Sequence, residues 1–320
     1  MSINIVQFTH SGGQYSLNRR EAQNNIKEWN ALQHRRKFLI AQGQYVENNV
    51  LSTSVDLLFW GEWEPTSYIK SVYHPADRVV YPTYLHSPFL KVDAKGKVNK
   101  YYPLSASAVP HANSSTGRCT PGKLCSPSFQ NTDPFVFGDC FFYSLCKQER
   151  FVSLQNLDPG SIILFGSTIS EKRNGPYFAL DTVFVVAEKR TYTPETFQED
   201  LAGFIPDYYH DIMGGSSWKS TKQFTCYKGA TFQHPVNGMY SFVPCKLYEE
   251  AGEGGFERPN LKMSCFSPSL PRFLTDNLNS APKYTETDVD TNKLIWDEVD
   301  RLLHSLGYKK GLNFGYQIVI

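Results

Sequence analysis

Asp133 combines an acidic side chain with a position at the start of an apolar segment. It precedes Pro134, and proline disfavours helical geometry in the preceding residue, so we expect a rigid turn that leads into a strand at 135–137. A carboxylate held at the mouth of a buried strand can act as a general base or stabilise positive charge. The alternative is that Asp133 caps the turn by accepting backbone N–H hydrogen bonds. Asn131, two residues earlier, is a candidate for substrate contact.

Two further carboxylates follow the apolar run at 55–61. Glu62 and Glu64 flank Trp63, and in an extended segment they point to the same side, which makes a paired-carboxylate arrangement available. Trp60 and Trp63 could stack a sugar or an unpaired base. The alternative is an aromatic core edge with exposed Glu side chains, because large aromatic residues mostly serve cores.

Asp181 is the single acid in the apolar run at 177–187. An unpaired buried carboxylate is costly, so this side chain either serves a site or bonds to neighbouring backbone or to an Arg, which is the commoner case. We rank Asp133 and Glu62 ahead of Glu64 and Asp181 as the essential acid, because Pro134 or the flanking tryptophans make their positions rigid.

A glycine pair follows the first predicted strand, at 3–8. The loop contains His10, Gly12, Gly13 and Gln14, and its glycines allow positive φ and close approach of the backbone to a ligand. It could therefore present N–H groups to an anion at a helix start. The spacing does not match a phosphate-binding or dinucleotide-binding loop. A plain tight turn is the alternative.

A basic face is predicted on a helix at 18–41, where apolar residues recur at helical spacing. The formal net charge of +1 excludes a globally basic protein, so a polyanionic partner would have to meet a local basic face. The alternative is that cations near the end of the helix only complement its dipole. The residues that could contact DNA phosphates are Arg20, Lys27, His34, Arg35, Arg36 and Lys37.

Seven cysteines in 320 residues suit reduced thiols in a cytoplasm better than a disulfide framework. Cys119 and Cys125 have the same spacing as Cys140 and Cys146, which raises the alternative of a zinc site. Because this spacing is wider than that of usual zinc motifs, we predict no metal site and no cofactor. The N-terminus lacks the features of a signal peptide and no apolar run is long enough to span a membrane, so we predict a cytoplasmic protein with no membrane partner.

The order of the predicted elements indicates one mixed α+β domain over residues 1–320 with a sheet-rich centre. The turn at 159–160 and the strands at 162–167 and 177–187 look like the barrel core of domains that read modified bases. Further strands are predicted at 3–8, within 52–63, and at 78–84, 97–102, 135–137, 224–232, 239–244 and 314–320, and helices at 18–41, 194–213 and 292–306.

Short runs spread over most of the chain carry a family resemblance. They lie at 8–13, 29–30, 34–38, 59–64, 131–134, 163–167, 227–231 and 238–242. Through them the chain resembles an uncharacterised bacterial family and the antiphage DNA glycosylases that excise glucosylated hydroxymethylcytosine from phage DNA. The segment 131–135 shares only the Asp-Pro-aromatic part of the uracil-glycosylase turn.

This resemblance implies a hydrolase of N-glycosidic bonds that acts on a modified base in DNA. Such an enzyme needs a carboxylate, an aromatic pocket and a basic groove, and the sequence offers candidates for all three. A non-catalytic reader of modified bases would need only the pocket and the groove. A zinc-dependent nucleic-acid enzyme is the third alternative, but the His-x-Glu and Pro-Cys-x-x-Cys signature of the zinc deaminases is missing.

Overall fold

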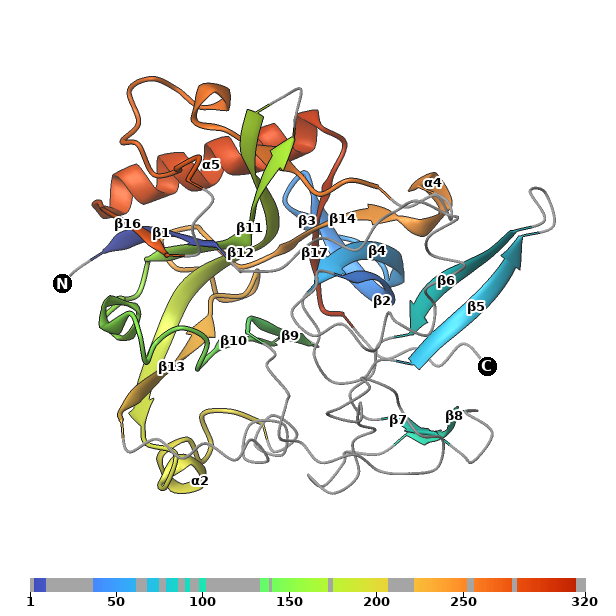
Figure 1. Ribbon diagram of the computed structural model, residues 1–320, viewed down its shortest axis with the longest axis horizontal. Coiled ribbons are helices and arrows are strands. Elements are labelled where there is room, and N and C mark those ends of the chain that lie inside the picture. The colour runs from blue at the N-terminus through green and yellow to red at the C-terminus, as the bar shows by residue number, and fades with distance from the viewer. Residues whose placement is uncertain are drawn as a thin grey trace.

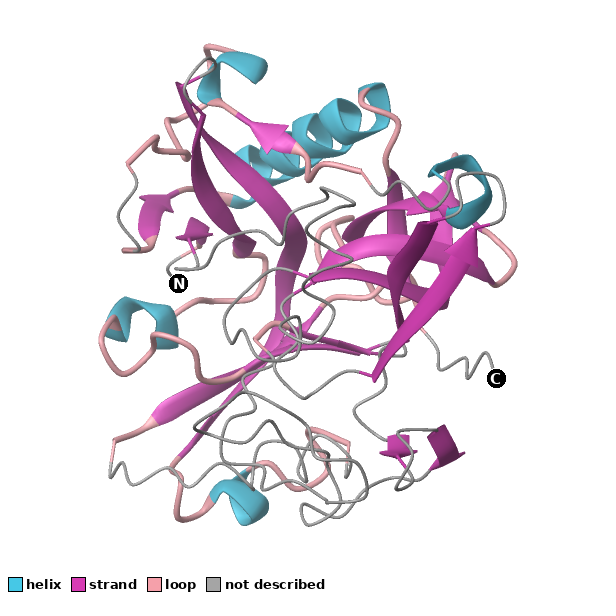
Figure 2. Cartoon of the chain, turned by 45° about the vertical axis from the view of Figure 1, so that its right-hand side comes forward, coloured by secondary structure: helices cyan, strands magenta, loops and turns pink. Residues whose placement is uncertain are grey.

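The fold is mixed α+β with a sheet-rich centre, as the sequence predicted. The computed structural model describes residues 3–9, 37–61, 68–74, 79–85, 90–92, 98–101, 133–137, 140–171, 175–206, 222–251, 256–277 and 281–314. Strands occupy the centre and the helices lie at the periphery (Figure 2).

A large sheet forms one part of this centre (Figure 1). β1 runs parallel to β11, whereas β11 and β12 form a long antiparallel pair. Residues 162–167 of β11 are buried, as expected for a strand with neighbours on both edges in the middle of a sheet. In order across the sheet the strands are β16 (Lys283–Glu286), β1 (Asn4–Thr9), β11 (Ile162–Glu171), β12 (Gly175–Tyr192), β13 (Phe224–Gly229), β10 (Cys140–Tyr143) and β9 (Phe135–Phe137), with β15 (Asn260–Leu261) paired to β12.

A small closed barrel of four strands forms the second part. It closes because β17 (Lys309–Leu312) pairs with both β14 (Val243–Leu247) and β2 (Lys37–Glu47), while β4 (Val55–Gly61) pairs with β2 and β14. A barrel-like core is therefore present. It is not built from the predicted segments at 162–167 and 177–187, because these are β11 and β12 of the large sheet. The remaining described strands are β3 (Val50–Leu51), β5 (Tyr68–His74) and β6 (Val79–Leu85), which extend the barrel sheet, and the pair β7 (Leu90–Val92) and β8 (Val98–Tyr101).

Helix α5 (Val289–Ser305) packs an apolar face onto the core. The Asp288 carboxylate caps its first turn by accepting a hydrogen bond from the Thr291 N–H at 2.7 Å. Trp296 is buried and donates from its indole N–H to the Tyr240 carbonyl at 3.0 Å. One continuous hydrophobic core includes residues of α5, the large sheet and the barrel. No helix in the described part of the chain is long and apolar enough to cross a membrane.

The predicted helix at 18–41 is wrong at its C-terminal end. Residues 37–41 belong to β2, whose pairing with β4 runs from Lys37 opposite Gly61 to Gly43 opposite Val55. Residues 38–41 are a continuous apolar run, which fits a buried strand, and their pairing with β4 decides for the strand. Residues 18–36 lie outside the described residues.

Other elements also differ from prediction. Within 194–206 only α2 (Phe197–Asp200) is helical, and the chain turns at Gly203 with a φ of 67°. β14 begins only at Val243, because Phe242 before it bridges to β12 in the large sheet. β17 was not predicted, and Asn313, with a φ of 49°, follows its last residue. The predicted strand at 314–320 lies almost entirely outside the described residues.

Candidate functional site

The structure describes the side chains of three predicted site residues, Asp133, Asp181 and Trp60. For Lys37 it gives only the backbone, in β2. Three further described residues border undescribed segments. Thr9 precedes the predicted glycine loop, Gly61 precedes the Glu62 segment, and Asp133 follows the Asn131 segment. The predicted residues outside the described part are His10, Gly12, Gly13, Gln14, Arg20, Lys27, His34, Arg35, Arg36, Glu62, Trp63, Glu64 and Asn131.

The Asp133 carboxylate binds three backbone N–H groups in the turn after β10. The Ser144 N–H donates to Oδ1 at 2.9 Å, the Leu145 N–H donates to Oδ2 at 2.7 Å, and the Cys146 N–H also donates to Oδ2. The residue is buried, with 1% of its surface exposed. Of the two roles predicted for Asp133, this geometry is that of the cap.

Two buried tyrosines hold the same turn from its other side. The Tyr192 hydroxyl donates to the Ser144 carbonyl at 2.7 Å, and the Tyr143 hydroxyl donates to the Cys146 carbonyl at 2.8 Å. Burial raises the pKa of both hydroxyls well above the usual value, and the negative charge of Asp133 raises them further. Both tyrosines therefore stay protonated as hydrogen-bond donors, and the turn is fixed by side chains from β10 and β12.

Lys147 connects this turn to the end of β1. Its ammonium group donates a hydrogen bond to the Thr9 carbonyl and lies 5.2 Å from the centre of the Phe8 ring. Thr9 is the last described residue before the predicted glycine loop that starts at His10. The residue before that loop is therefore bonded to the residue that follows the Asp133 turn.

Asp181 forms a buried ion pair with Arg258. The Arg258 Nη1 donates to Asp181 Oδ1 at 2.9 Å and to the Ser167 hydroxyl at 3.2 Å. The exposed fraction of the side chain is 0% for Arg258 and 3% for Asp181. An Arg partner was one of the explanations predicted for this carboxylate. Removing two charges from water is expensive, so a buried pair of this kind is weak evidence for a purely stabilising role.

The backbone around Asp181 is irregular. Opposite β11, the pairing passes from Thr182 directly to Leu180, so Asp181 is the extra residue of a β-bulge. Bulges redirect a side chain and often lie next to active sites. On the facing strand, a Cβ at Gly166 would lie 2.3 Å from the Ala179 carbonyl oxygen, so glycine is required for this close approach.

Trp60 is a core residue. It is 2% exposed, and its indole N–H donates to the Phe256 carbonyl at 2.7 Å. This observation agrees with the alternative of an aromatic core edge and removes Trp60 from the candidates for stacking a ligand, which leaves Trp63. Because Phe256 lies two residues before Arg258, the end of β4 is tied to the buried ion pair.

Two neighbouring sets of polar contacts lie near the end of β1, and we call them together the polar junction: the half-buried contacts of Thr9 with Lys147 and Thr168, and the buried contacts of Arg258 with Ser167 and Asp181. The hydroxyls of Thr9 and Thr168 lie 3.5 Å apart, and Thr168 is next to Ser167 of the ion-pair cluster. A site built here would have a rigid floor with fixed charges in a medium of low dielectric constant. The polar junction consists of Thr9, Lys147, Ser167, Thr168, Asp181 and Arg258.

Sequence reasoning missed Arg258 and Lys147. The sequence contained one signal for Arg258. Its positive charge lies next to Pro259 and near apolar residues, and it could pair with the single acid of the run at 177–187. No comparable signal existed for Lys147, because its link to β1 depends on the tertiary fold.

The described residues do not form a metal cluster of three or more His, Cys, Asp or Glu side chains. Cys140 and Cys146 are half-buried. Cys119 and Cys125, the other two members of the considered zinc set, lie outside the described part of the chain.

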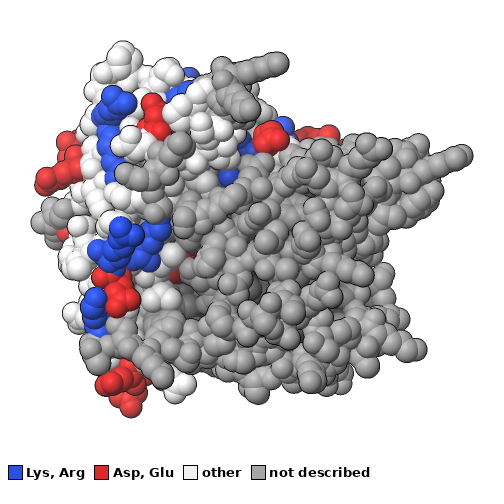
Figure 3. Space-filling model, in the orientation of Figure 1, with Lys and Arg blue, Asp and Glu red and all other residues white. Residues whose placement is uncertain are grey.

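Charges of both signs are mixed on the described part of the surface. On the face shown in Figure 3, acidic side chains lie beside the described Lys and Arg side chains. The predicted DNA-binding residues, 20–37, fall in the undescribed segment or, at Lys37, have no described side chain. The basic groove therefore stays a prediction.

No match to the chain was found among protein-family models, curated proteins or solved structures. The resemblance to antiphage DNA glycosylases therefore remains a hypothesis that rests on the short sequence runs.

Proposed function

We propose that this protein is a DNA glycosylase-like hydrolase that excises a modified base from phage DNA in the cytoplasm, with glucosylated hydroxymethylcytosine as the candidate substrate. The observation that carries the proposal is the polar junction. There the end of β1, which leads into the predicted glycine loop, bonds to Lys147 next to the Asp133 turn, and the Asp181–Arg258 pair is buried. The family resemblance supplies the reaction type.

Within this proposal the essential acid is Glu62 or Glu64. Asp133 accepts three backbone N–H bonds and Asp181 is bound to Arg258, so each of these carboxylates already has a positioning task. Glu62 follows Gly61 directly at the end of β4. Its carboxylate would orient a water molecule and accept its proton while the water oxygen bonds to the sugar carbon. The bond from that carbon to the base breaks, and its electron pair leaves with the base.

The remaining predicted residues have supporting roles. Trp63 would stack the extruded base or its sugar, and the loop 10–14 and Asn131 would contact the same nucleotide. The basic residues between Arg20 and Lys37 would bind DNA phosphates. We assign no cofactor to this reaction.

The test is incubation of the purified protein with DNA that contains glucosylated hydroxymethylcytosine, hydroxymethylcytosine or cytosine. We expect released base and abasic sites from modified DNA alone, detected by mass spectrometry and by alkaline strand cleavage. Glu62→Gln should lower the rate by about 10²- to 10⁴-fold, the usual contribution of a general base. Glu199→Gln, an exposed carboxylate of α2, is the matched control and should keep the rate. The proposal fails if no base is released from any of the three DNAs.

A non-catalytic reader of modified bases is the second candidate. It is favoured by the observation that both described candidate carboxylates, Asp133 and Asp181, are already engaged in the fold. A reader would bind modified DNA more tightly than unmodified DNA without releasing base. Binding measured by fluorescence anisotropy on the same three DNAs, together with the product assay, separates the two functions.

A further inference from the structure

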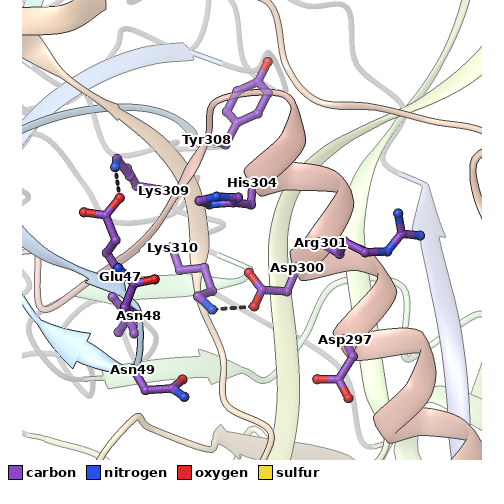
Figure 4. A pocket seen from close by; sticks show the side chains of 11 residues that line it. Glu47, Asn48, Asn49, Asp297, Asp300, Arg301, His304, Tyr308, Lys309 and Lys310 are labelled. Carbon is purple, nitrogen blue, oxygen red and sulfur yellow. Dashed lines mark hydrogen bonds and ion pairs between the residues drawn. The ribbon is translucent and has the colours of Figure 1, made fainter.

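A pocket of about 300 Å³ lies between the barrel and the C-terminal half of α5. Its walls are the turn between β2 and β3, one face of α5 and the start of β17 (Figure 4). The volume is at the lower end of the range for small-molecule sites, about 300–1,000 Å³. None of its lining residues belongs to the polar junction.

Two ion pairs face each other across this pocket. Lys309 of β17 pairs with Glu47 of β2, and Lys310 pairs with Asp300 of α5 (Figure 4). Both ammonium groups are largely buried, with 19% and 13% of their side chains exposed, whereas Glu47 and Asp300 are 39% and 28% exposed. Each pair is neutral as a unit, yet offers N–H donors and carboxylate acceptors within one site.

Aromatic rings support the Lys310 side of the pocket. The Lys310 ammonium lies 5.7 Å from the centre of the Tyr240 ring and 5.4 Å from that of Trp296. Tyr240 is only 5% exposed, and its hydroxyl has no hydrogen-bond partner among the described groups. Burial, and then the charge of Asp300, raise its pKa, so the hydroxyl stays protonated. Tyr240 does not itself line the pocket, so its part is to hold the Lys310 ammonium through the ring contact.

Two asparagine residues complete the wall next to Glu47. Asn48 and Asn49 form the two-residue turn between β2 and β3, with φ angles of 51° and 58°, and both line the pocket. Such a turn needs positive φ at both positions, which Asn tolerates, so its geometry is set by the backbone. Each carboxamide adds a donor and an acceptor without adding charge.

We propose that this pocket binds a small neutral polyhydroxy ligand of the monosaccharide class. Three acids (Glu47, Asp297, Asp300) and three bases (Arg301, Lys309, Lys310) line it, so their formal charges cancel. An anion or a cation would have to compete with an existing ion pair for its partner. A hydroxyl group donates to the carboxylate and accepts from the ammonium of the same pair, so neighbouring hydroxyls satisfy both without separating them. This inference is independent of the proposed DNA chemistry.

The test is saturation-transfer difference NMR of the full-length protein with D-glucose and D-galactose. We expect transfer to the sugar protons, with an affinity that inorganic phosphate and glycine do not reduce. Glu47→Gln and Asp300→Asn should each raise the Kd at least about tenfold, the loss expected when one charge-assisted hydrogen bond becomes neutral. Asp290→Asn, an exposed residue at the other end of α5, is the matched control and should bind as the wild type does.

Circular dichroism on all variants verifies that they are folded. Glu47 and Asp300 lie on different elements, so if one variant fails to fold, the other still tests the proposal. The proposal is overturned if neither sugar shows saturation transfer at millimolar concentration. It is also overturned if both variants bind as tightly as the wild type, or if phosphate or glycine displaces the sugars.

Discussion

Asp133 and Asp181 are both buried carboxylates, but different partners hold them. Asp133 is held by three backbone N–H groups of one turn, whereas Asp181 faces the guanidinium of Arg258. In the first case the charge organises local backbone. In the second it links two segments that are 77 positions apart in the sequence. The two side chains therefore make different predictions for mutants.

Replacing Asp133 by Ala should destabilise the fold strongly. It leaves three N–H groups without their acceptor in a buried turn, and each unsatisfied buried group costs roughly 1–3 kcal/mol, so we expect a loss of about 3 kcal/mol or more. Urea unfolding measures this free energy. Asp297→Ala, which removes an exposed ion pair with Lys293, should change it by less than about 0.5 kcal/mol. Equal stability of the two variants would contradict the capping role of Asp133.

The described cysteines should differ in reactivity. Cys226 and Cys245 are fully buried, and burial raises the pKa of both thiols, so almost no thiolate is present near pH 8. Cys265 is exposed. Iodoacetamide at pH 8 should therefore label Cys265 in the folded protein, and Cys226 and Cys245 only after denaturation. Peptide mapping by mass spectrometry makes this measurement, and rapid labelling of Cys226 in the native protein would show that the core around it opens.

The hairpin of β11 and β12 shows how local backbone geometry supports the polar junction. The bulge at Asp181 turns this residue out of the regular pairing, and the strands come so close at Gly166 that a side chain has no space. Gly175 lies at the start of β12 in the same hairpin. A Cβ at Gly175 would meet no neighbouring atom, but its backbone has a φ of 66°, which favours glycine.

The two glycines should therefore differ in their tolerance to Ala. Gly166→Ala places a Cβ against the Ala179 carbonyl oxygen and the Phe178 ring, and overpacking against backbone should cost about 3 kcal/mol or more. Gly175→Ala meets no atom and should cost about 1–2 kcal/mol for its left-handed backbone. Thermal and urea unfolding compare both variants with the wild type. A smaller loss for Gly166→Ala than for Gly175→Ala would mean that the strands move apart easily.

At the scale of the whole molecule, a segment that starts at Phe256 connects the barrel with the large sheet. Its Phe256 carbonyl accepts the Trp60 indole N–H from β4, and Arg258 binds Asp181 of β12. Pro259 then accepts a hydrogen bond from the Leu180 N–H at 3.0 Å. The charged pair therefore lies where the two sheets are held together.

Removing one partner of the Asp181–Arg258 pair should lower the free energy of unfolding more than replacing both partners by apolar residues. Arg258→Met leaves the Asp181 carboxylate buried without its cation, and we expect a loss of about 3–5 kcal/mol in the free energy of unfolding. The double variant Asp181→Leu/Arg258→Met should recover most of this loss, because an apolar pair needs no desolvation of charge. A double-mutant cycle by urea unfolding measures the coupling. If the double variant folds well but loses function, the pair serves the site. If the losses of unfolding free energy in the two single variants add up in the double variant, strong coupling between the two residues is contradicted.

The sequence alone determined where most apolar strands and the last helix lie. The predicted strands at 3–8, within 52–63, and at 135–137, 162–167 and 177–187 correspond to β1, β4, β9, β11 and β12, and the predicted helix at 292–306 corresponds to α5. These predictions succeeded because apolar runs and helical spacing are local properties of the chain. They also explain why the sheet-rich α+β class was predictable.

Only the tertiary structure decided how these elements combine. The barrel closes through β17, a short strand with the sequence Lys-Lys-Gly-Leu, in which no apolar pattern indicates pairing on both sides. Residues 37–41 form a strand and not the end of a helix, because β4 offers continuous backbone partners. Likewise the cap around Asp133 and the Arg258 partner of Asp181 depend on contacts between segments distant in sequence, and such contacts leave no periodic signal in either segment.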